Sequence, residues 1–299
     1  MLEPEDGRVP IRRPGFSYLP QFIGKEESEQ LISYFSELRP LWEQRHRDGQ
    51  AERDAKHGRR LTRPVYWLGA WQFASLGYYA EPEHREDRCV RAEGFPVVMQ
   101  RVLERLVPLL HEEHGDREEH AHGHLPNTCL VNFYGREVGK GVPRDYARLR
   151  MHRDGEPGPV VMFNIGQPGR LEFLDPSLSP EPELALWTRH RSVTILSGAD
   201  YKDRLYHRVT QVRTGQHPVM HSTVPDFELR RISVSFRHVP EEVISDFGQL
   251  PGPARDRVRE YVQQLAEHSP HFRAQLESEA EPEPPEPPEP PEPGEVSGS

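Results

Sequence analysis

The chain has 299 residues, two cysteines and a formal net charge of −10 at pH 7. This length allows one large domain with extensions, and Cys89 and Cys129 alone exclude a disulfide-stabilised framework. There is no hydrophobic N-terminal signal and no apolar run of about 18 residues, so the sequence predicts neither a secreted protein nor a membrane protein. We expect a monomer that is cytoplasmic, or nuclear if its source is a eukaryote.

The negative charge is concentrated at the C-terminal end. Residues 277–299 contain eight glutamates and no basic residue, and without these eight charges the chain has a net charge of −2. The segment 281–293 repeats Pro-Glu and Pro-Pro-Glu without an apolar residue, so burial cannot offset the entropy cost of ordering it. We predict that this tail is disordered. It either has no specific function or contacts an unknown partner. The charge of the remaining chain neither supports nor excludes a polyanionic substrate.

The N-terminal part of the chain is predicted to contain a strand and two helices. Apolar residues within 16–23 indicate a short strand that runs into a loop, and the spacing over 26–38 indicates an amphipathic helix. A second helix is predicted over 97–110, with Pro108 disturbing its last turn. The polar stretch 111–126 that follows contains five histidines, and we interpret it as a flexible charged loop to which no metal is assigned.

Short β-type runs separated by glycine and proline dominate the chain after residue 127. They are expected at 129–134, 160–165, 171–174, 192–196 and 232–236. A series of short strands preceded by helices is typical of an α+β fold in which a double-sheet barrel or jelly roll is supported by helices.

Two histidines and an aspartate form a candidate metal site. His152 and Asp154 are two residues apart, so both side chains point to the same face of an extended backbone. This pair alone is weak evidence for a metal site, because such a pair is more often a surface turn with a salt-bridged histidine. With His207 as a third ligand, the set is the two-histidine, one-carboxylate arrangement of non-haem Fe(II) oxygenases, which leaves positions open for an oxo-acid and O₂.

The segment 231–237 alternates strictly between polar and apolar residues, so that Arg231, Ser233, Ser235 and Arg237 share one face. If this face lines a barrel interior, its two buried guanidinium groups require anions, and a dicarboxylate such as 2-oxoglutarate supplies two carboxylates. The alternative is a half-exposed strand with its arginines in solvent. The position of the segment, 24 residues after His207, favours the co-substrate anchor.

These motifs occur in a fixed order along the chain: Asn132-x-Tyr134, His152-x-Asp154-x-Glu156, His207 and the polar face of 231–237. Together they resemble the signature of the AlkB-like branch of the 2-oxoglutarate/Fe(II)-dependent dioxygenases, over about residues 16–240. The runs 18–23 and 63–69 are also similar to the opening segment of that family and to the lid that precedes its barrel.

The resemblance implies a double-stranded β-helix, which is a jelly-roll form, with supporting N-terminal helices. It also implies an enzyme that uses Fe(2+), 2-oxoglutarate and O₂, with iron bound by His152, Asp154 and His207. The resemblance also implies that 2-oxoglutarate is bound by Asn132, Tyr134, Ser233 and Arg231, with Arg231 on the distal carboxylate. Arg237 would complete the pocket near the iron. Glu156 would face the target base.

On this basis we divide the chain into five segments. They are an N-terminal extension (1–15), a region of helices and substrate lid (16–126), the catalytic core (127–240), a C-terminal helical segment (241–276) and the disordered tail (277–299).

Two departures from the family pattern concern the substrate side of the site. The 17 residues between Tyr134 and His152 are more than a compact member has, and this insertion contains Arg136, Lys140, Arg144, Arg148 and Arg150. We predict a basic loop at the mouth of the site. Ser233 stands where bacterial repair members tend to have asparagine, so the details of the pocket differ.

Our first hypothesis for the substrate is an N-alkylated base in DNA or RNA, as in DNA repair. Oxidation of an N-methyl group would release formaldehyde, with succinate and CO₂ as co-products. Glu156, the basic insertion and aromatic residues that could stack on a flipped base, Trp67 and Phe73 among them, motivate this hypothesis. The alternatives are a hydroxylase or demethylase of a protein side chain or small molecule, and a non-catalytic binding module, which the complete metal triad disfavours.

Overall fold

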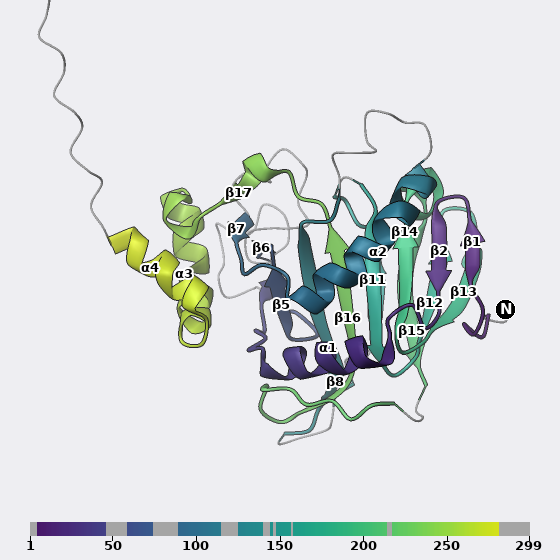
Figure 1. The fold of residues 1–299 in the computed structure, drawn as a ribbon, viewed down its shortest axis with the longest axis horizontal. Helices are drawn as coiled ribbons and strands as arrows, with labels where there is room; N and C mark the ends of the chain where they lie inside the picture. The colour runs from purple at the N-terminus through teal and green to yellow at the C-terminus, as the bar shows by residue number, and fades with distance from the viewer. Residues whose placement is uncertain are drawn as a thin grey trace, which may run out of the picture.

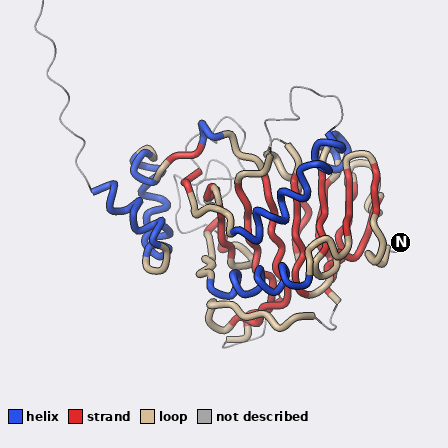
Figure 2. Tube along the Cα trace, viewed as in Figure 1, coloured by secondary structure: helices blue, strands red, loops and turns tan. Residues whose placement is uncertain are grey.

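A computed structural model describes residues 5–45, 59–73, 89–114, 125–139, 144–145, 148–156, 158–213 and 217–280. Figure 1 shows a large, strongly bent sheet with two helices on one face and a helical pair at one end. Figure 2 shows the same arrangement by type of secondary structure.

Two antiparallel sheets form the core. In the larger sheet the order is β1 (Ile11–Arg13), β2 (Phe16–Leu19), β14 (Ser192–Leu196), β11 (Val160–Gly166), β16 (Phe227–Arg237), β8 (Thr128–Glu137) and β5 (Val65–Leu68), with β9 (Arg144–Asp145) also paired to β8. In the smaller sheet the order is β10 (Leu149–His152), β15 (Tyr206–Val212), β12 (Gly169–Leu174) and β13 (Leu184–Thr188). The fold is the predicted jelly-roll type of double-stranded β-helix.

Apolar side chains fill part of the space between the two sheets. Phe16 and Met162 of the larger sheet belong to one buried cluster with Leu171 and Phe173 of the smaller sheet. Next to this cluster the two sheets enclose a pocket, which Met162 and Leu171 line together with polar side chains.

Helices α1 (Lys25–Glu37) and α2 (Val97–His114) cover the outer face of the larger sheet (Figure 1). Leu31 and Phe35 of α1, Val102 of α2, and Val234 and Phe236 of β16 belong to one buried cluster. The predicted strand and both predicted helices of the N-terminal part are therefore present. They support the core by covering the apolar face of β16 and its neighbours.

Helix α2 continues past Pro108 to His114, so its predicted end at residue 110 is wrong. Proline removes one backbone donor, which leaves the carbonyl group of Glu104 without its helical partner. Both residues are on the exposed side of α2, where water can bind that carbonyl group.

Two further helices, α3 (Gly252–Ala266) and α4 (Pro270–Ala280), form the C-terminal helical pair. They follow short elements at Glu241–Val243, Ile244–Ser245 (β17) and Phe247–Gln249, and β17 pairs with β7 (Cys89–Arg91), which pairs with β6 (Ala70–Gln72). The remaining strands, β3 (Gln44–Arg45) and β4 (Arg59–Arg60), form a separate two-stranded sheet.

Helix α4 extends into the segment that was predicted to be tail from residue 277. Glu279 accepts hydrogen bonds of 2.8 and 2.7 Å from the guanidinium group of Arg259 on α3, which gives the last turn a tertiary partner. Residues 281–299 and most of the histidine-rich stretch lie outside the described residues, so the predictions for them stay predictions. No helix in the described ranges is long and apolar enough to cross a membrane.

We expect Phe236→Ala to destabilise the fold by about 3–5 kcal/mol, because the ring is fully buried and its removal leaves a cavity. The ring centroid lies 4.5 Å from that of Phe163 and 5.5 Å from that of Phe95. Urea unfolding measures the effect. Val219, which is 76% exposed, provides the control Val219→Ala, with an expected change within about 0.5 kcal/mol. Equal effects for the two variants would contradict the packing described.

His190 joins α1 to the end of β11. Its Nδ1 accepts a hydrogen bond of 3.2 Å from the backbone N–H of Gly166, and its Nε2 lies 3.3 Å from Ser28 Oγ. Burial, together with the nearby charge of Arg191, lowers the pKa of His190 from 6.5 to about 4. The folded protein therefore holds this ring neutral at a pH where the unfolded chain protonates it.

We expect this histidine to make stability fall as the pH decreases from 6.5 to 4, because the unfolded state then binds more protons. The ring is half-buried, so solvent screening limits its contribution to the free energy of unfolding to about 1 kcal/mol. The test compares urea unfolding of the wild type and His190→Gln at pH 7 and pH 4.5. On acidification the free energy of unfolding should decrease by about 1 kcal/mol less in the variant than in the wild type. Identical decreases would contradict the lowered pKa of His190.

Candidate metal and co-substrate site

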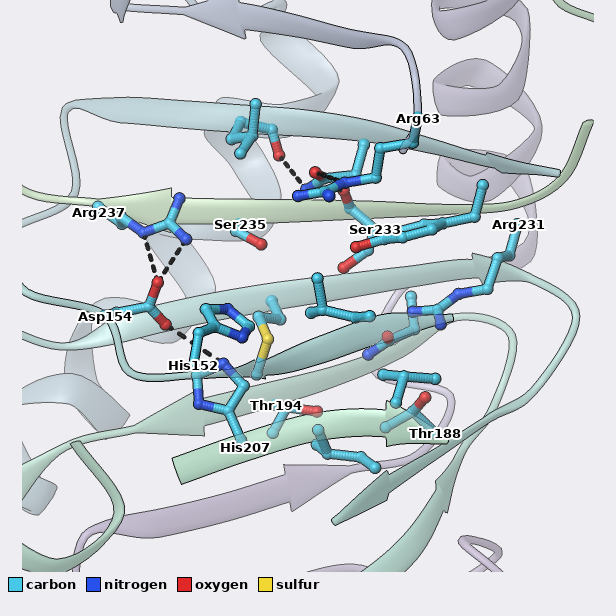
Figure 3. Close-up of a pocket in the computed structure, with 18 residues that line it drawn as sticks. Arg63, His152, Asp154, Thr188, Thr194, His207, Arg231, Ser233, Ser235 and Arg237 are labelled. Atoms are coloured by element: carbon cyan, nitrogen blue, oxygen red, sulfur yellow. Dashed lines mark hydrogen bonds and ion pairs between the residues drawn. The ribbon is translucent and has the colours of Figure 1, made fainter. Parts of the chain in front are cut away.

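The three predicted metal ligands come together at one end of the pocket (Figure 3). His152 ends β10, Asp154 lies in the loop after it, and His207 is the register partner of His152 on β15. One ligand atom from each of the three residues lies within 4.8 Å of the others. No other such cluster of three is found among the described residues.

Neighbouring groups fix the atoms that these ligands can offer to a metal. Arg237 donates to Asp154 Oδ1 from Nη2 at 2.6 Å and from Nε at 3.1 Å. The other oxygen, Oδ2, lies 3.5 Å from His207 Nε2. The ring of His152 is held by a contact of 2.9 Å between Nδ1 and the carbonyl oxygen of Arg150, which leaves Nε2 for a metal.

Burial and charge give the triad the protonation state that a divalent cation needs. Burial lowers the pKa of His207 to about 3, with the nearby His152 adding to the effect, and burial also lowers the pKa of His152. Burial opposes the charge of Asp154, but Arg237 and the two histidines outweigh it and hold its pKa well below the usual value. Two neutral imidazoles and one carboxylate are thus available, which is the donor set of non-haem Fe(II).

Strand β16 runs along the pocket from the metal ligands to the opposite end. Its residues Arg231, Ser233, Ser235 and Arg237 all line the pocket and are all buried, as the alternation of the sequence predicts. The alternative of solvent-exposed arginines is therefore wrong. Figure 3 shows Arg231 at one end of the pocket and the triad with Arg237 at the other.

The guanidinium group of Arg231 is placed to bind an anion. It is 4% exposed, and its Nη1 has no hydrogen-bond partner among the described residues. Tyr134 is its cross-strand partner on β8, with the tyrosine ring centroid 4.6 Å from Arg231 Cζ. A Cβ atom at residue 169 would lie 2.7 Å from Arg231 Nη1, so Gly169 leaves room for this group.

Further polar groups of the pocket fit a carboxylate ligand. Asn164 Nδ2 and Thr194 Oγ1 are buried without a hydrogen-bond partner in the described part of the chain, and both residues line the pocket. A buried polar group without a partner is costly, so a ligand that binds it is favoured. The pocket therefore fits a dicarboxylate that binds the metal at one end and Arg231 at the other.

Arg63 is a pocket residue that the sequence did not single out. It precedes β5, is buried, and donates from Nε to Asn132 Oδ1. The amide nitrogen of Asn132 donates to the carbonyl oxygens of Leu130 and Ser233, each at 3.3 Å. Asn132 thus orients Arg63 in this structure. The predicted contact of Asn132 with 2-oxoglutarate stays a prediction. No spacing rule would have connected residue 63 with residue 132.

Glu156 lies next to Arg237, which binds the predicted ligand Asp154, and is not among the residues that line the pocket. It is 4% exposed, and Oε1 lies 3.4 Å from Arg237 Nε. Neither side-chain oxygen has a hydrogen-bond partner among the residues described.

The structure corrects the predicted substrate contacts of Trp67 and Phe73. Neither lines the pocket, and both belong to the buried cluster under the helices. The indole nitrogen of Trp67 donates to Glu43 at 3.2 Å, and the ring of Phe73 stacks on Trp71 and Tyr261. These large apolar rings are more stable in the core than in a polar pocket.

Part of the predicted basic loop is regular structure. Strand β8 continues to Glu137, and β10 begins at Leu149. Arg148 and Arg150 are exposed, and Arg136 is half-buried. Lys140 and the side chain of Arg144 lie outside the described residues.

Comparison with known proteins agrees with this geometry. Residues 15–237 match the 2OG-Fe(II) oxygenase superfamily. The chain belongs to this superfamily. The match confirms, at the level of the superfamily, the resemblance carried by the sequence motifs. It identifies the protein as a 2-oxoglutarate-dependent Fe(II) dioxygenase that uses Fe(II), 2-oxoglutarate and O₂.

Two solved structures are similar to this oxygenase. The structure of OsALKBH1 has 17% sequence identity and a TM-score of 0.46, over 77% of this chain and 99% of that chain. A 2OG-Fe(II) oxygenase family oxidoreductase from Burkholderia pseudomallei has 14% identity and a TM-score of 0.42, over 75% of this chain and 85% of that chain. A comparison with curated proteins gives no match.

We expect Arg231→Gln to weaken 2-oxoglutarate binding by about 2–3 kcal/mol, roughly 30- to 150-fold, because a charged hydrogen-bonding partner is lost. Calorimetric titration of the Mn(II)-loaded protein without O₂ measures the dissociation constant. The neighbouring Arg230 does not line the pocket, so Arg230→Gln is the matched control and should bind within about threefold of the wild type. Equal affinity in both variants would remove Arg231 from the co-substrate site.

Proposed function

We propose that this oxygenase demethylates N-alkylated bases in DNA or RNA. The observation that carries the proposal is the exposed basic surface next to iron ligand His152. Arg148, Arg150 and Arg153 are exposed on both sides of that ligand. A nucleic-acid substrate needs positive charge for its phosphates close to the position where a base enters the site.

The backbone at β10 explains how a pocket wall and a basic surface occur together. The register of β10 against β15 shifts between Leu149 and His152, and both of these residues line the pocket. Arg150 and Met151 between them are exposed. Strand β10 therefore carries the metal ligand His152 at the pocket and the cationic side chain of Arg150 at the surface.

Glu156 supports a nitrogen-rich substrate. Its buried carboxylate accepts no hydrogen bond from the described residues and lies beside the group formed by Arg237 and Asp154. Amino and ring N–H groups of a base are donors that such a carboxylate can accept. In this role Glu156 would orient the alkylated base toward the metal.

The chain itself contributes binding, orientation and exclusion of water. His152, Asp154 and His207 would hold the metal, and Arg231 would hold the distal carboxylate of 2-oxoglutarate. When bound, Fe(II) and 2-oxoglutarate would activate O₂, which is the oxidant: one oxygen atom would enter the substrate C–H bond and the other the succinate that forms from 2-oxoglutarate with loss of CO₂. A hydroxylated N-methyl group then leaves the base as formaldehyde.

The direct test measures formaldehyde from methylated DNA and RNA oligonucleotides, with His152→Ala as the inactive control. We expect release from at least one common N-methylated base, decreasing steeply with salt concentration because phosphate contacts release counterions. No release from any of these bases by protein that still converts 2-oxoglutarate to succinate would overturn the proposal. Succinate formation stimulated by peptides or metabolites instead would indicate a protein side chain or small molecule as substrate.

A charge-reversal pair tests the basic surface separately. Arg148→Glu/Arg150→Glu should raise the KM for the oligonucleotide by at least about tenfold and reduce the salt dependence. The control Arg12→Glu/Lys25→Glu makes the same change in net charge at exposed positions on β1 and α1. Equal effects of the two pairs would show that net charge alone, and not this surface, determines binding.

A further inference from the structure

A short π-helix, Ala199–Arg204, directly precedes strand β15, which carries the metal ligand His207. Its side chains Tyr201 and Lys202 are buried. Tyr201 packs against Phe16 and Phe173, with ring centroids 5.0 and 5.2 Å away. These contacts fix the π-helix to the apolar part of the space between the sheets. π-Helical turns are rare and occur mostly near functional sites.

Lys202 points from this helix to the loop that carries Asp154. Its ammonium group donates to the carbonyl oxygen of Asp154 at 3.2 Å and to the carbonyl oxygen of Glu156. The side chain is buried, with 8% of the residue exposed. A buried ammonium group is costly unless it is paired or hydrogen-bonded, and these two carbonyl groups give it partners.

The same loop makes a second contact with the π-helix. Arg153 donates from Nη1 to the carbonyl oxygen of Asp203 at 2.8 Å. The arginine is exposed and its guanidinium carbon lies 4.5 Å from the ring centroid of Tyr206, so this contact is at the surface. Of these two contacts between the π-helix and the loop that carries Asp154, the contact made by Lys202 is the buried one.

Two cations thus act on Asp154 from different directions. Arg237 binds one side-chain oxygen of Asp154, and Lys202 binds its backbone carbonyl group. Because Lys202 also holds the carbonyl group of Glu156, it restrains the backbone on both sides of residue 155. A metal ligand in a loop needs such restraint, since ligand geometry must be held within about 0.5 Å.

We propose that Lys202 is a positioning residue that fixes the loop bearing Asp154 and Glu156 relative to His207, and so sets the geometry of the iron site. The proposal depends on the metal triad and not on the nucleic-acid substrate. Its test therefore uses metal binding, and it can fail or succeed independently of the substrate assignment.

The decisive variant is Lys202→Met, which keeps the length and apolar stem of the side chain but removes its donors. Lys202→Arg keeps the charge and the donors. Arg204→Met is the matched control on the same π-helix, because Arg204 donates hydrogen bonds to Asp200 and Glu183 at the surface, away from the carbonyl groups that Lys202 binds.

Three measurements on the full chain separate positioning from general stability. They are the Mn(II) dissociation constant of the metal-free protein by calorimetry, the visible absorption spectrum of the Co(II)-loaded protein, and the unfolding temperature of the metal-free protein. The Co(II) spectrum reports the coordination geometry directly, whereas the unfolding temperature reports only the fold.

We expect Lys202→Met to weaken Mn(II) binding by about 10- to 100-fold and to alter the Co(II) spectrum, as is usual when a group supporting a metal ligand is removed. Lys202→Arg should restore most of the affinity. Arg204→Met should leave affinity and spectrum unchanged even if its unfolding temperature falls. If Lys202→Met does not fold, Lys202→Gln, which is too short to reach both carbonyl groups, gives the same comparison. Wild-type affinity and an unchanged spectrum in folded Lys202→Met or folded Lys202→Gln would overturn the proposal.

Discussion

Strand β16 must satisfy two opposite environments, and the rest of the molecule is arranged around this constraint. Its apolar side chains, Val234 and Phe236 among them, need a covered face, which α1 and α2 provide. Its polar side chains face inward, where two guanidinium groups would be unstable without negative charge. The helices and the pocket are therefore two consequences of a single alternating sequence.

The electrostatics of the pocket explain why it suits a metal and a dicarboxylate together. Three guanidinium groups, of Arg63, Arg231 and Arg237, line it, and the only carboxylate among the described lining residues is that of Asp154. Arg237 donates hydrogen bonds to one carboxylate oxygen of Asp154, and the other oxygen lies near the ring of His207. A dicarboxylate offsets the positive charge that remains, including that of a divalent metal.

Much of this site could be predicted because its residues follow local rules. The alternation of 231–237 identified both the buried strand and its polar face, and the spacing of His152 and Asp154 identified two ligands. Trp67 and Phe73 were misplaced because the sequence does not show whether an aromatic side chain before the barrel faces the core or a base-binding pocket. Arg63 and Lys202 were missed because their roles depend on contacts with residues 132, 154 and 156, which only tertiary structure brings close.

Arg63 also changes how the chain can be divided. It reaches the pocket from the segment before β5, and β5 pairs with β8 while β2 pairs with β14. The boundary placed after residue 126 is thus a boundary along the chain and not one in space. Arg63 is the one lining residue of the described pocket that precedes the strands of the catalytic core. The smallest part of this protein that contains all the residues lining this pocket must therefore include Arg63.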